Sequence, residues 1–152
     1  MKLRPGLFGK LPGHGDFVRR HLPRSFVAPW DAWLSEGLQA APDARWTPWR
    51  FHLAPGACGP DAAAGVLAPS EDSVGRRFPL TLAALGVGGT PPASWYAALE
   101  ALAAEALDAD ALAAVLPDLP DDALAEGEGS RLWTTDGCEA RFEAGFAALL
   151  AP

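Results

Sequence analysis

Two short polar stretches of this 152-residue sequence carry side chains that could do chemistry. In the first, residues 9–17, His14 and Asp16 lie two positions apart among glycines and a proline. Histidine titrates near neutral pH and a carboxylate can orient its ring, so the pair could form an acid–base couple or part of a metal site. A metal would need a third ligand, and the remaining histidines are His21 and His52. We therefore expect no metal and no other cofactor. The plainer alternative to any chemical role of the pair is that Asp16 caps backbone N–H groups while His14 is exposed.

The second stretch, residues 70–77, combines hydroxyl, carboxylate and guanidinium groups in one loop. Ser70 and Asp72 suit an N-cap or an Asx-turn. Arg76 and Arg77 can pair with them, or with an incoming carboxylate or phosphate. Two interpretations stay open, an ion pair between Asp72 and Arg76 that shapes the loop, or a contact with a partner. Ser70 lacks the G-x-S-x-G setting of a serine nucleophile, so we assign no catalytic residue.

A lysine directly after a glycine invites comparison with phosphate-binding loops. A P-loop needs serine or threonine after its lysine, whereas Leu11 follows Lys10 here. We therefore expect a turn at the end of a strand, with Lys10 in solvent. The two polar stretches together supply the candidate partner-binding residues of the chain: Lys10, Gly13, His14, Gly15, Asp16, Ser70, Asp72, Gly75, Arg76 and Arg77.

The neighbouring sequence indicates how the first stretch is positioned. Residues 6–8 read as the end of a strand, and the apolar spacing becomes helical from Phe26 to Leu38. A strand, a glycine-rich turn and a helix is the arrangement with which α/β proteins place polar groups at the edge of a sheet. We expect Ser25 to cap this helix and residues 19–23 to form a basic connector.

The rest of the chain alternates predicted strands with predicted helices. We expect strands at 49–53, 65–69, 78–85 and 132–135, a long helix from Ser94 to residue 112 or 116, and a closing helix over 139–150. Residues 117–129 are acidic and contain proline and glycine, which is typical of an exposed, mobile connection. This order predicts a single α/β domain over residues 1–152, built as a three-layer α/β/α sandwich with a mixed sheet.

The charge is distributed unevenly along the chain. The net charge is −7, but residues 1–52 contain eight Lys/Arg and four acids, whereas residues 53–152 contain four and fifteen. A nucleic-acid backbone would be repelled by the larger part of this molecule, so we expect no nucleic-acid partner. A basic end on an acidic body suits a protein partner better.

Compartment signals are few. The first residues lack the apolar run of a signal peptide, and no window approaches the roughly 20 apolar residues that a membrane span needs. Cys58 and Cys138 are isolated and form no CxxC pair, which indicates neither a zinc site nor a disulfide framework. We expect a cytoplasmic protein.

Four blocks of the chain resemble the TagF family, also called ImpM, of type VI secretion-associated proteins. The segment FGKLPGHGDF at residues 8–17 resembles the family pattern FGKLP-x-x-GDF, and PSEDSVGRRFPL at residues 69–80 resembles PS-x-D-x-x-GR-x-FPL. Residues 22–34 resemble the first helix of the family, and residues 132–134 its late LW strand. The likeness covers nearly the whole chain and is densest over residues 6–82, while the part after the acidic linker is short.

The resemblance implies a three-layer α/β fold and a post-translational repressor of type VI secretion. It also implies a protein partner, a cytoplasmic scaffold protein with a forkhead-associated (FHA) domain, and no enzymatic activity. We therefore expect a non-enzymatic binding module whose two polar loops converge at one edge of the sheet.

Two other functions remain in view. A small hydrolase or phosphate-binding enzyme using His14, Asp16 and Arg76 would need a concave site of about 300 Å³ or more with convergent polar groups. A structural subunit could instead form a symmetric homodimer through Trp30, Trp33 or Trp95, whereas the helical spacing of Trp30 and Trp33 favours a place in the core.

Overall fold

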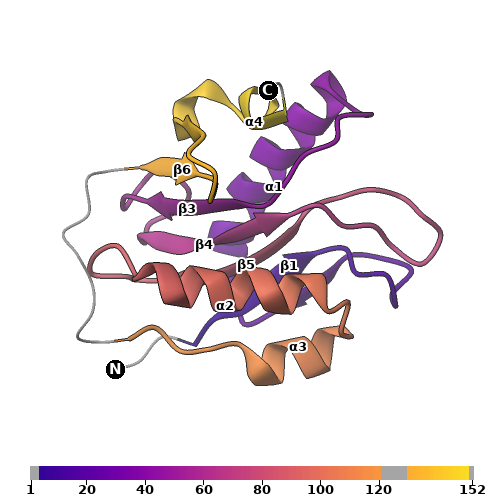
Figure 1. Ribbon diagram of the computed structural model, residues 1–152, viewed down its shortest axis with the longest axis horizontal. Coiled ribbons are helices and arrows are strands. Elements are labelled where there is room, and N and C mark those ends of the chain that lie inside the picture. Colours follow the sequence, from indigo (N-terminus) through magenta and orange to yellow (C-terminus); the bar gives the residue numbers. More distant parts are fainter. Residues whose placement is uncertain (1–3, 121–129, 151–152) are drawn as a thin grey trace.

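A seven-stranded sheet forms the centre of the protein in the computed structural model, which describes residues 4–120 and 130–150 (Figure 1). The strand order is β2-β1-β5-β4-β3-β6-β7. The strands are β1 (Gly6–Gly9), β2 (Val18–Arg20), β3 (Trp49–Leu53), β4 (Ala63–Ala68), β5 (Leu80–Leu85), β6 (Arg131–Trp133) and β7 (Glu139–Ala140). The helices are α1 (Arg24–Ala40), α2 (Ala93–Ala104), α3 (Ala109–Val115) and α4 (Ala147–Leu150), with a 3₁₀ turn η1 (Phe142–Ala144).

The α/β class is confirmed, but the predicted mixed sheet is wrong. Every strand pairing in the described part of the chain is antiparallel. The reason lies in the connections. Loops join β1 to β2, β3 to β4, β4 to β5 and β6 to β7, and each of these pairs consists of direct neighbours. A loop between neighbouring strands reverses the chain, whereas parallel neighbours need a crossover. The helices α1, α2 and α3 instead connect strands that are not neighbours.

Alternating residues of the central strands feed two hydrophobic clusters. In β4, Val66 belongs to the cluster that includes Trp95, Leu99 and Leu112 of α2 and α3, and the next residue, Leu67, belongs to the other. The second cluster contains the buried faces of α1 and α4. Side chains alternate between the two faces of a strand, so these clusters lie on opposite faces of the sheet. Figure 1 accordingly shows α1 and α4 on one side of the strands and α2 and α3 on the other.

The tryptophans considered for a dimer interface belong mainly to the core, as the helical spacing of Trp30 predicts. Trp30 is completely buried, and its indole N–H donates to the Thr81 hydroxyl at 2.8 Å. Trp95 is also buried and donates to the carbonyl of Pro117. Trp33 is half-buried, and its N–H donates to the carbonyl of Phe142. The suggested homodimer surface is therefore wrong for Trp30 and Trp95, because neither ring is accessible.

The helix and strands that were predicted from regular apolar spacing are present in the structure. The predicted helix from residue 26 and the strands predicted at 49–53, 65–69, 78–85 and 132–135 correspond to α1, β3, β4, β5 and β6. Ser25 does not cap α1, since Pro23 occupies the N-cap position. The basic connector predicted at 19–23 contains most of the short strand β2.

The predicted long helix from Ser94 is two helices. The chain breaks at Ala106, whose φ is +55°, and Asp108 then starts α3 by accepting a hydrogen bond from the N–H of Ala111 at 2.8 Å. The predicted closing helix is wrong over most of its length. Residues 139–146 form β7, η1 and a turn at Gly145, whose φ of +87° suits glycine. In the predicted acidic connection, residues 121–129 lie outside the described residues.

The described helices can also be compared with the dimensions of a membrane. None of them combines the length and the apolar character that a bilayer-spanning helix requires.

Candidate functional site

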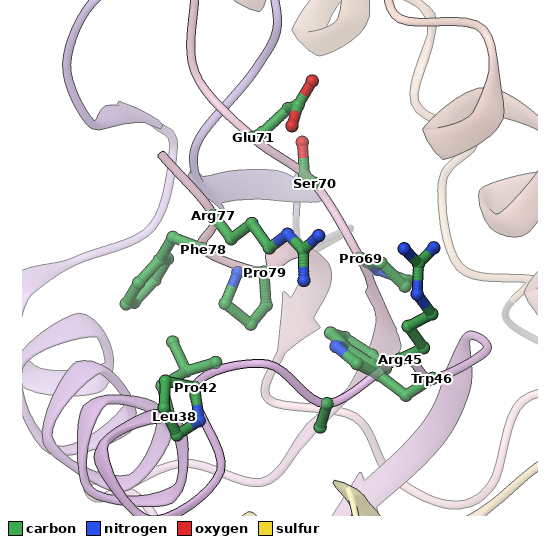
Figure 2. Close-up of a pocket in the computed structure, with 11 residues that line it drawn as sticks. Leu38, Pro42, Arg45, Trp46, Pro69, Ser70, Glu71, Arg77, Phe78 and Pro79 are labelled. Atoms are coloured by element: carbon green, nitrogen blue, oxygen red, sulfur yellow. The ribbon is translucent and has the colours of Figure 1, made fainter. Parts of the chain in front are cut away.

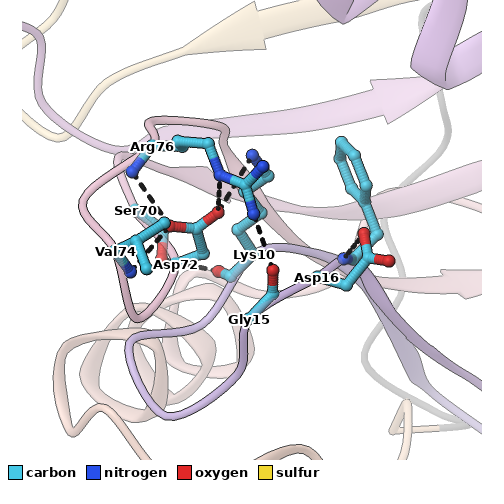
Figure 3. A network of polar contacts seen from close by, with 8 residues as sticks. Lys10, Gly15, Asp16, Ser70, Asp72, Val74 and Arg76 are labelled. Carbon is cyan, nitrogen blue, oxygen red and sulfur yellow. Dashed lines mark hydrogen bonds and ion pairs between the residues drawn. The ribbon is translucent and has the colours of Figure 1, made fainter.

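The two polar stretches of the sequence form one surface, called here the loop cluster, which consists of residues 10–17 and 70–77 (Figure 3). The N–H of Ser73 donates to the carbonyl of His14 at 2.8 Å. The hydroxyl of Ser70 donates to the carbonyl of Lys10 at 2.6 Å, and the guanidinium of Arg76 donates to the carbonyl of Gly15 at 2.7 Å. Three hydrogen bonds to backbone carbonyls therefore hold residues about 60 positions apart against each other.

The sheet topology brings these segments to the same place. Strand β1 pairs with β5, and β5 pairs with β4, so the loop after β1 lies beside the loop that joins β4 to β5. Gly9 permits the close approach. Its φ is +138°, and a β-carbon on Gly9 would lie 2.1 Å from the carbonyl oxygen of Pro79. Only glycine fits this exit from β1 without moving the second loop.

Asp72 is the centre of the loop cluster, and its side chain is completely buried. Its Oδ1 accepts from the N–H groups of Val74 and Arg76 at 3.0 and 2.9 Å. Its Oδ2 lies 2.7 Å from Nε of Arg76 and 3.3 Å from Nζ of Lys10. Burial by itself raises the pKa of this carboxyl, but the backbone and side-chain hydrogen bonds from Arg76, Val74 and Lys10 outweigh it and lower the pKa to about 2. Asp72 is therefore an ionised structural anchor at neutral pH.

The predicted position of Lys10 in solvent is wrong. Lys10 is only 8% exposed, its ammonium group pairs with Asp72, and it lies 4.9 Å from the centre of the Phe17 ring. The buried carboxylate requires a nearby cation, and Lys10 supplies it together with Arg76. Of the two interpretations of the second stretch, the internal ion pair between Asp72 and Arg76 is present.

His14 and Asp16 make separate contacts with backbone N–H groups. Nε2 of half-buried His14 accepts from the N–H of Ala109, at the start of α3, at 3.1 Å. Asp16 is exposed and accepts from the N–H of the adjacent Phe17 at 2.7 Å. Asp16 thus caps a backbone N–H as the plainer alternative expected, whereas His14 ties the first loop to α3.

The remaining predicted residues lie at the surface of the second loop or in open space. Gly75 has a φ of +85°, and its N–H donates to the carbonyl of Asp72 at 3.1 Å, which closes the loop around the carboxylate. A β-carbon on Gly13 would meet nothing within 4 Å. Arg77 is exposed and lines a neighbouring groove.

Two exposed hydrophobic residues of the loop cluster were not among the candidate residues predicted from the sequence. Phe17 is 47% exposed and Val74 is 71% exposed, while a third exposed hydrophobic residue, Val115, lies on α3. The ring of Phe17 stacks on Phe8 and meets Phe78 edge to face, with ring centres 4.8 Å apart for the latter. The available signal was that both residues are apolar within turns made of glycine and polar side chains, where no core face is expected.

A groove of about 360 Å³ lies beside the loop cluster (Figure 2). It is bounded by the end of α1, the segment after it and the start and end of the second loop; its lining residues include Leu38, Pro42, Arg45, Trp46, Pro69, Ser70, Glu71, Arg77, Phe78 and Pro79. Its size reaches the range of ligand pockets, but His14, Asp16 and Arg76 do not line it. The three residues of the enzyme hypothesis therefore lie outside this groove.

The described residues offer no ready metal site, since no three His, Cys, Asp or Glu side chains among residues 4–120 and 130–150 are grouped to hold an ion.

The chain is similar to known proteins both in sequence family and in structure. Residues 6–122 match the family model described as "TagF N-terminal domain, Type VI secretion system-associated". The crystal structure of PA0076 from Pseudomonas aeruginosa PAO1 is similar to this chain at 38% sequence identity, with a TM-score of 0.69. That alignment covers 76% of this chain and 64% of PA0076, so the matched region is less than two thirds of that protein. No curated protein sequence matches the chain.

Proposed function

This chain belongs to the TagF N-terminal domain family of type VI secretion-associated proteins, and from that membership we propose that it represses type VI secretion after translation by binding another protein. The proposed partner is a scaffold protein with an FHA domain in the cytoplasm, as the resemblance of the sequence implies. The proposal includes no catalytic step.

The observation that carries the proposal is that exposed apolar side chains stand on a rigid polar base. Val74 and Phe17 project from loops that Asp72, Lys10 and Arg76 hold in place. Preformed loops lose little conformational entropy when a partner binds. Aromatic side chains and arginine are also favoured at the centres of protein interfaces. We assign contact roles to Phe17, Val74 and Arg76, and positioning roles to Lys10 and Asp72.

The enzyme alternative has less support in the geometry. Each of its three residues is engaged in a contact that maintains the loops: His14 with Ala109, Asp16 with Phe17, and Arg76 with Asp72 and Gly15. These contacts give each of the three side chains a structural role in the loops.

The two hydrophobic clusters also support the predicted layering. One cluster joins the sheet to α2 and α3, and the other joins it to α1 and α4. We propose on this basis that the domain is a three-layer α/β/α sandwich with helices covering both faces of an antiparallel sheet.

A pair of matched valine substitutions tests the proposed surface. If Val74 is a hot-spot contact, Val74→Ser is expected to weaken binding of the purified FHA scaffold protein by at least about tenfold, because truncating a hot spot costs about 2 kcal/mol or more. Val115→Ser makes the same chemical change at another exposed valine, and binding should stay within about twofold of the wild type. Isothermal titration calorimetry measures both affinities, and thermal melts confirm that both variants are folded.

The outcomes separate clearly. Loss of affinity in Val74→Ser alone supports the loop cluster as the partner surface. Unchanged affinity in Val74→Ser, or equal losses in both variants, would refute this assignment.

A further inference from the structure

The groove beside the loop cluster has a preformed apolar floor. Pro69 and Pro79 line the groove, and their rings fix the local backbone (Figure 2). Trp46 is held edge to face against Phe146, with ring centres 5.4 Å apart. Phe78 is 6% exposed and packs against the rings of the core. A ligand would therefore meet a surface that needs little rearrangement.

Two arginines without partners stand over this floor. Arg45 and Arg77 are exposed, and neither makes a hydrogen bond or ion pair through its side chain within the described residues. By contrast, the guanidinium groups of Arg20, Arg50 and Arg131 each pair with a carboxylate.

The lining also contains an acidic residue, but it does not neutralise the groove. In Figure 2 the carboxylate of Glu71 points away from Trp46 and from the apolar floor, beyond Ser70. The groove is therefore a locally positive, partly apolar surface on a chain whose net charge is −7. That overall charge disfavours a nucleic acid as the occupant.

We propose that this groove binds an acidic peptide segment of a partner protein, in which aspartate or glutamate flanks a large apolar side chain. The apolar side chain would pack on Trp46, and the carboxylates would pair with Arg45 and Arg77. A guanidinium binds a carboxylate through two parallel hydrogen bonds, which gives geometric specificity as well as attraction. This assignment deepens the proposed protein-binding function and rests on it, since it names the chemistry of a segment that the same side of the domain accepts.

Synthetic peptides test the assignment without the scaffold protein. The probe is a fluorescein-labelled eight-residue peptide in which two leucines alternate with aspartate and glutamate, and the control peptide has asparagine and glutamine in place of the acids. Fluorescence anisotropy should show that the full chain binds the acidic peptide at least about tenfold more tightly than the amide peptide. Raising NaCl from about 50 mM to about 500 mM should weaken binding of the acidic peptide, because salt screens exposed charges.

Charge reversal identifies the surface. The double variant Arg45→Glu/Arg77→Glu should reduce affinity for the acidic peptide by at least about tenfold. Arg24→Glu is the control for each single reversal, Arg45→Glu or Arg77→Glu: it reverses one exposed arginine at the opposite end of α1, and should leave affinity within about twofold. If the double reversal fails to fold, the single changes Arg45→Gln and Arg77→Gln test the same contacts, each with a smaller loss.

Several results would overturn the assignment. These are equal binding of the two peptides, binding of neither, unchanged binding by the arginine variants, or binding only of a peptide that carries phosphothreonine in place of the acids. The Val74→Ser titration has no part in this assay, so failure of the groove assignment and failure of the Val74 surface are seen in separate experiments.

Discussion

At the scale of single residues, one buried carboxylate organises the region that we assign to partner binding. Asp72 has no exposed side-chain surface, and an isolated charge in that position would be costly. One carboxylate oxygen instead accepts hydrogen bonds from two backbone N–H groups, and the other pairs with the side chains of Arg76 and Lys10. Lys10 belongs to the first loop, and Arg76 belongs to the second loop but also donates to the carbonyl of Gly15 in the first. The carboxylate of Asp72 therefore links both halves of the loop cluster.

The substitution Asp72→Asn is expected to lower the melting temperature at pH 7 by at least about 5 °C, since it leaves buried Lys10 without its counter-charge. The pKa of Asp72 is about 2 in the folded protein, below the ordinary value of 3.8. The lowered pKa means that the ionised carboxylate stabilises the folded state above about pH 4, and that this contribution is lost as the pH falls through about 2. The difference in melting temperature between wild type and variant should therefore shrink as the pH is lowered.

Differential scanning calorimetry across this pH range provides the check. Asp16→Asn is the control, because Asp16 is exposed and bonds only to the adjacent N–H among the described residues. Its melting temperature should follow the wild type at every pH. A difference for Asp72→Asn that is absent, or that stays constant down to pH 2, would contradict the anchoring role.

Some of these residue roles could be predicted, and others could not. Asp72 and Arg76 are four residues apart in a loop, so their pairing was a reasonable alternative from the sequence. The burial of Lys10 depends on a carboxylate 62 positions away, and nothing in the sequence around Lys10 indicates that contact. Likewise, the bond from Ala109 to His14 depends on where α3 begins.

At the scale of elements, prediction succeeded where the chain has a strong local pattern. The helical spacing of Phe26, Trp30 and Leu34 located α1, and the apolar runs located β4 and β5. Alanine-rich sequence has high helix propensity throughout, so it could not reveal the break between α2 and α3. That break is made by the backbone of Ala106 in the left-handed region and by the Asp108 cap.

Because of this break, we expect glycine substitutions at two alanines to change the stability of the protein in opposite directions. Ala106→Gly should stabilise the protein by up to about 1 kcal/mol, because glycine adopts a positive φ without the steric cost that alanine carries. Ala101→Gly, at an exposed position inside α2, should destabilise it by about 1 kcal/mol.

Urea denaturation measures both free energies of unfolding. If Ala106→Gly destabilised the protein as much as Ala101→Gly, residues 93–115 would form one continuous helix in solution and the break would be refuted.

At the scale of the whole molecule, the site exists because of strand order. The loop after β1 and the loop between β4 and β5 meet because β5 lies between β1 and β4 (Figure 1). Strand order depends on long-range pairing, and a single sequence shows only which segments are extended. The sequence predicted the polar loops, their convergence and the α/β class, and the hydrogen bonds between the loops confirm the convergence. The antiparallel sheet and the arginine-lined groove required the structure.

The loop cluster and the groove are two separate surfaces that lie side by side. The loop cluster presents Phe17 and Val74 on a base anchored by Asp72, and the groove presents Arg45 and Arg77 over Trp46. Both use residues of the 70–77 loop, so one partner could cover them together. We propose that this side of the domain, formed by the loop cluster, receives the FHA scaffold protein.

Hydrogen–deuterium exchange of the full chain, with and without the FHA scaffold protein, shows whether the partner covers the loop cluster. Binding should slow exchange of backbone N–H groups in residues 10–17 and 70–77, while exchange in residues 139–150 should not change. Formation of the complex without added protection in either loop, or with protection confined to residues 139–150, would contradict the account.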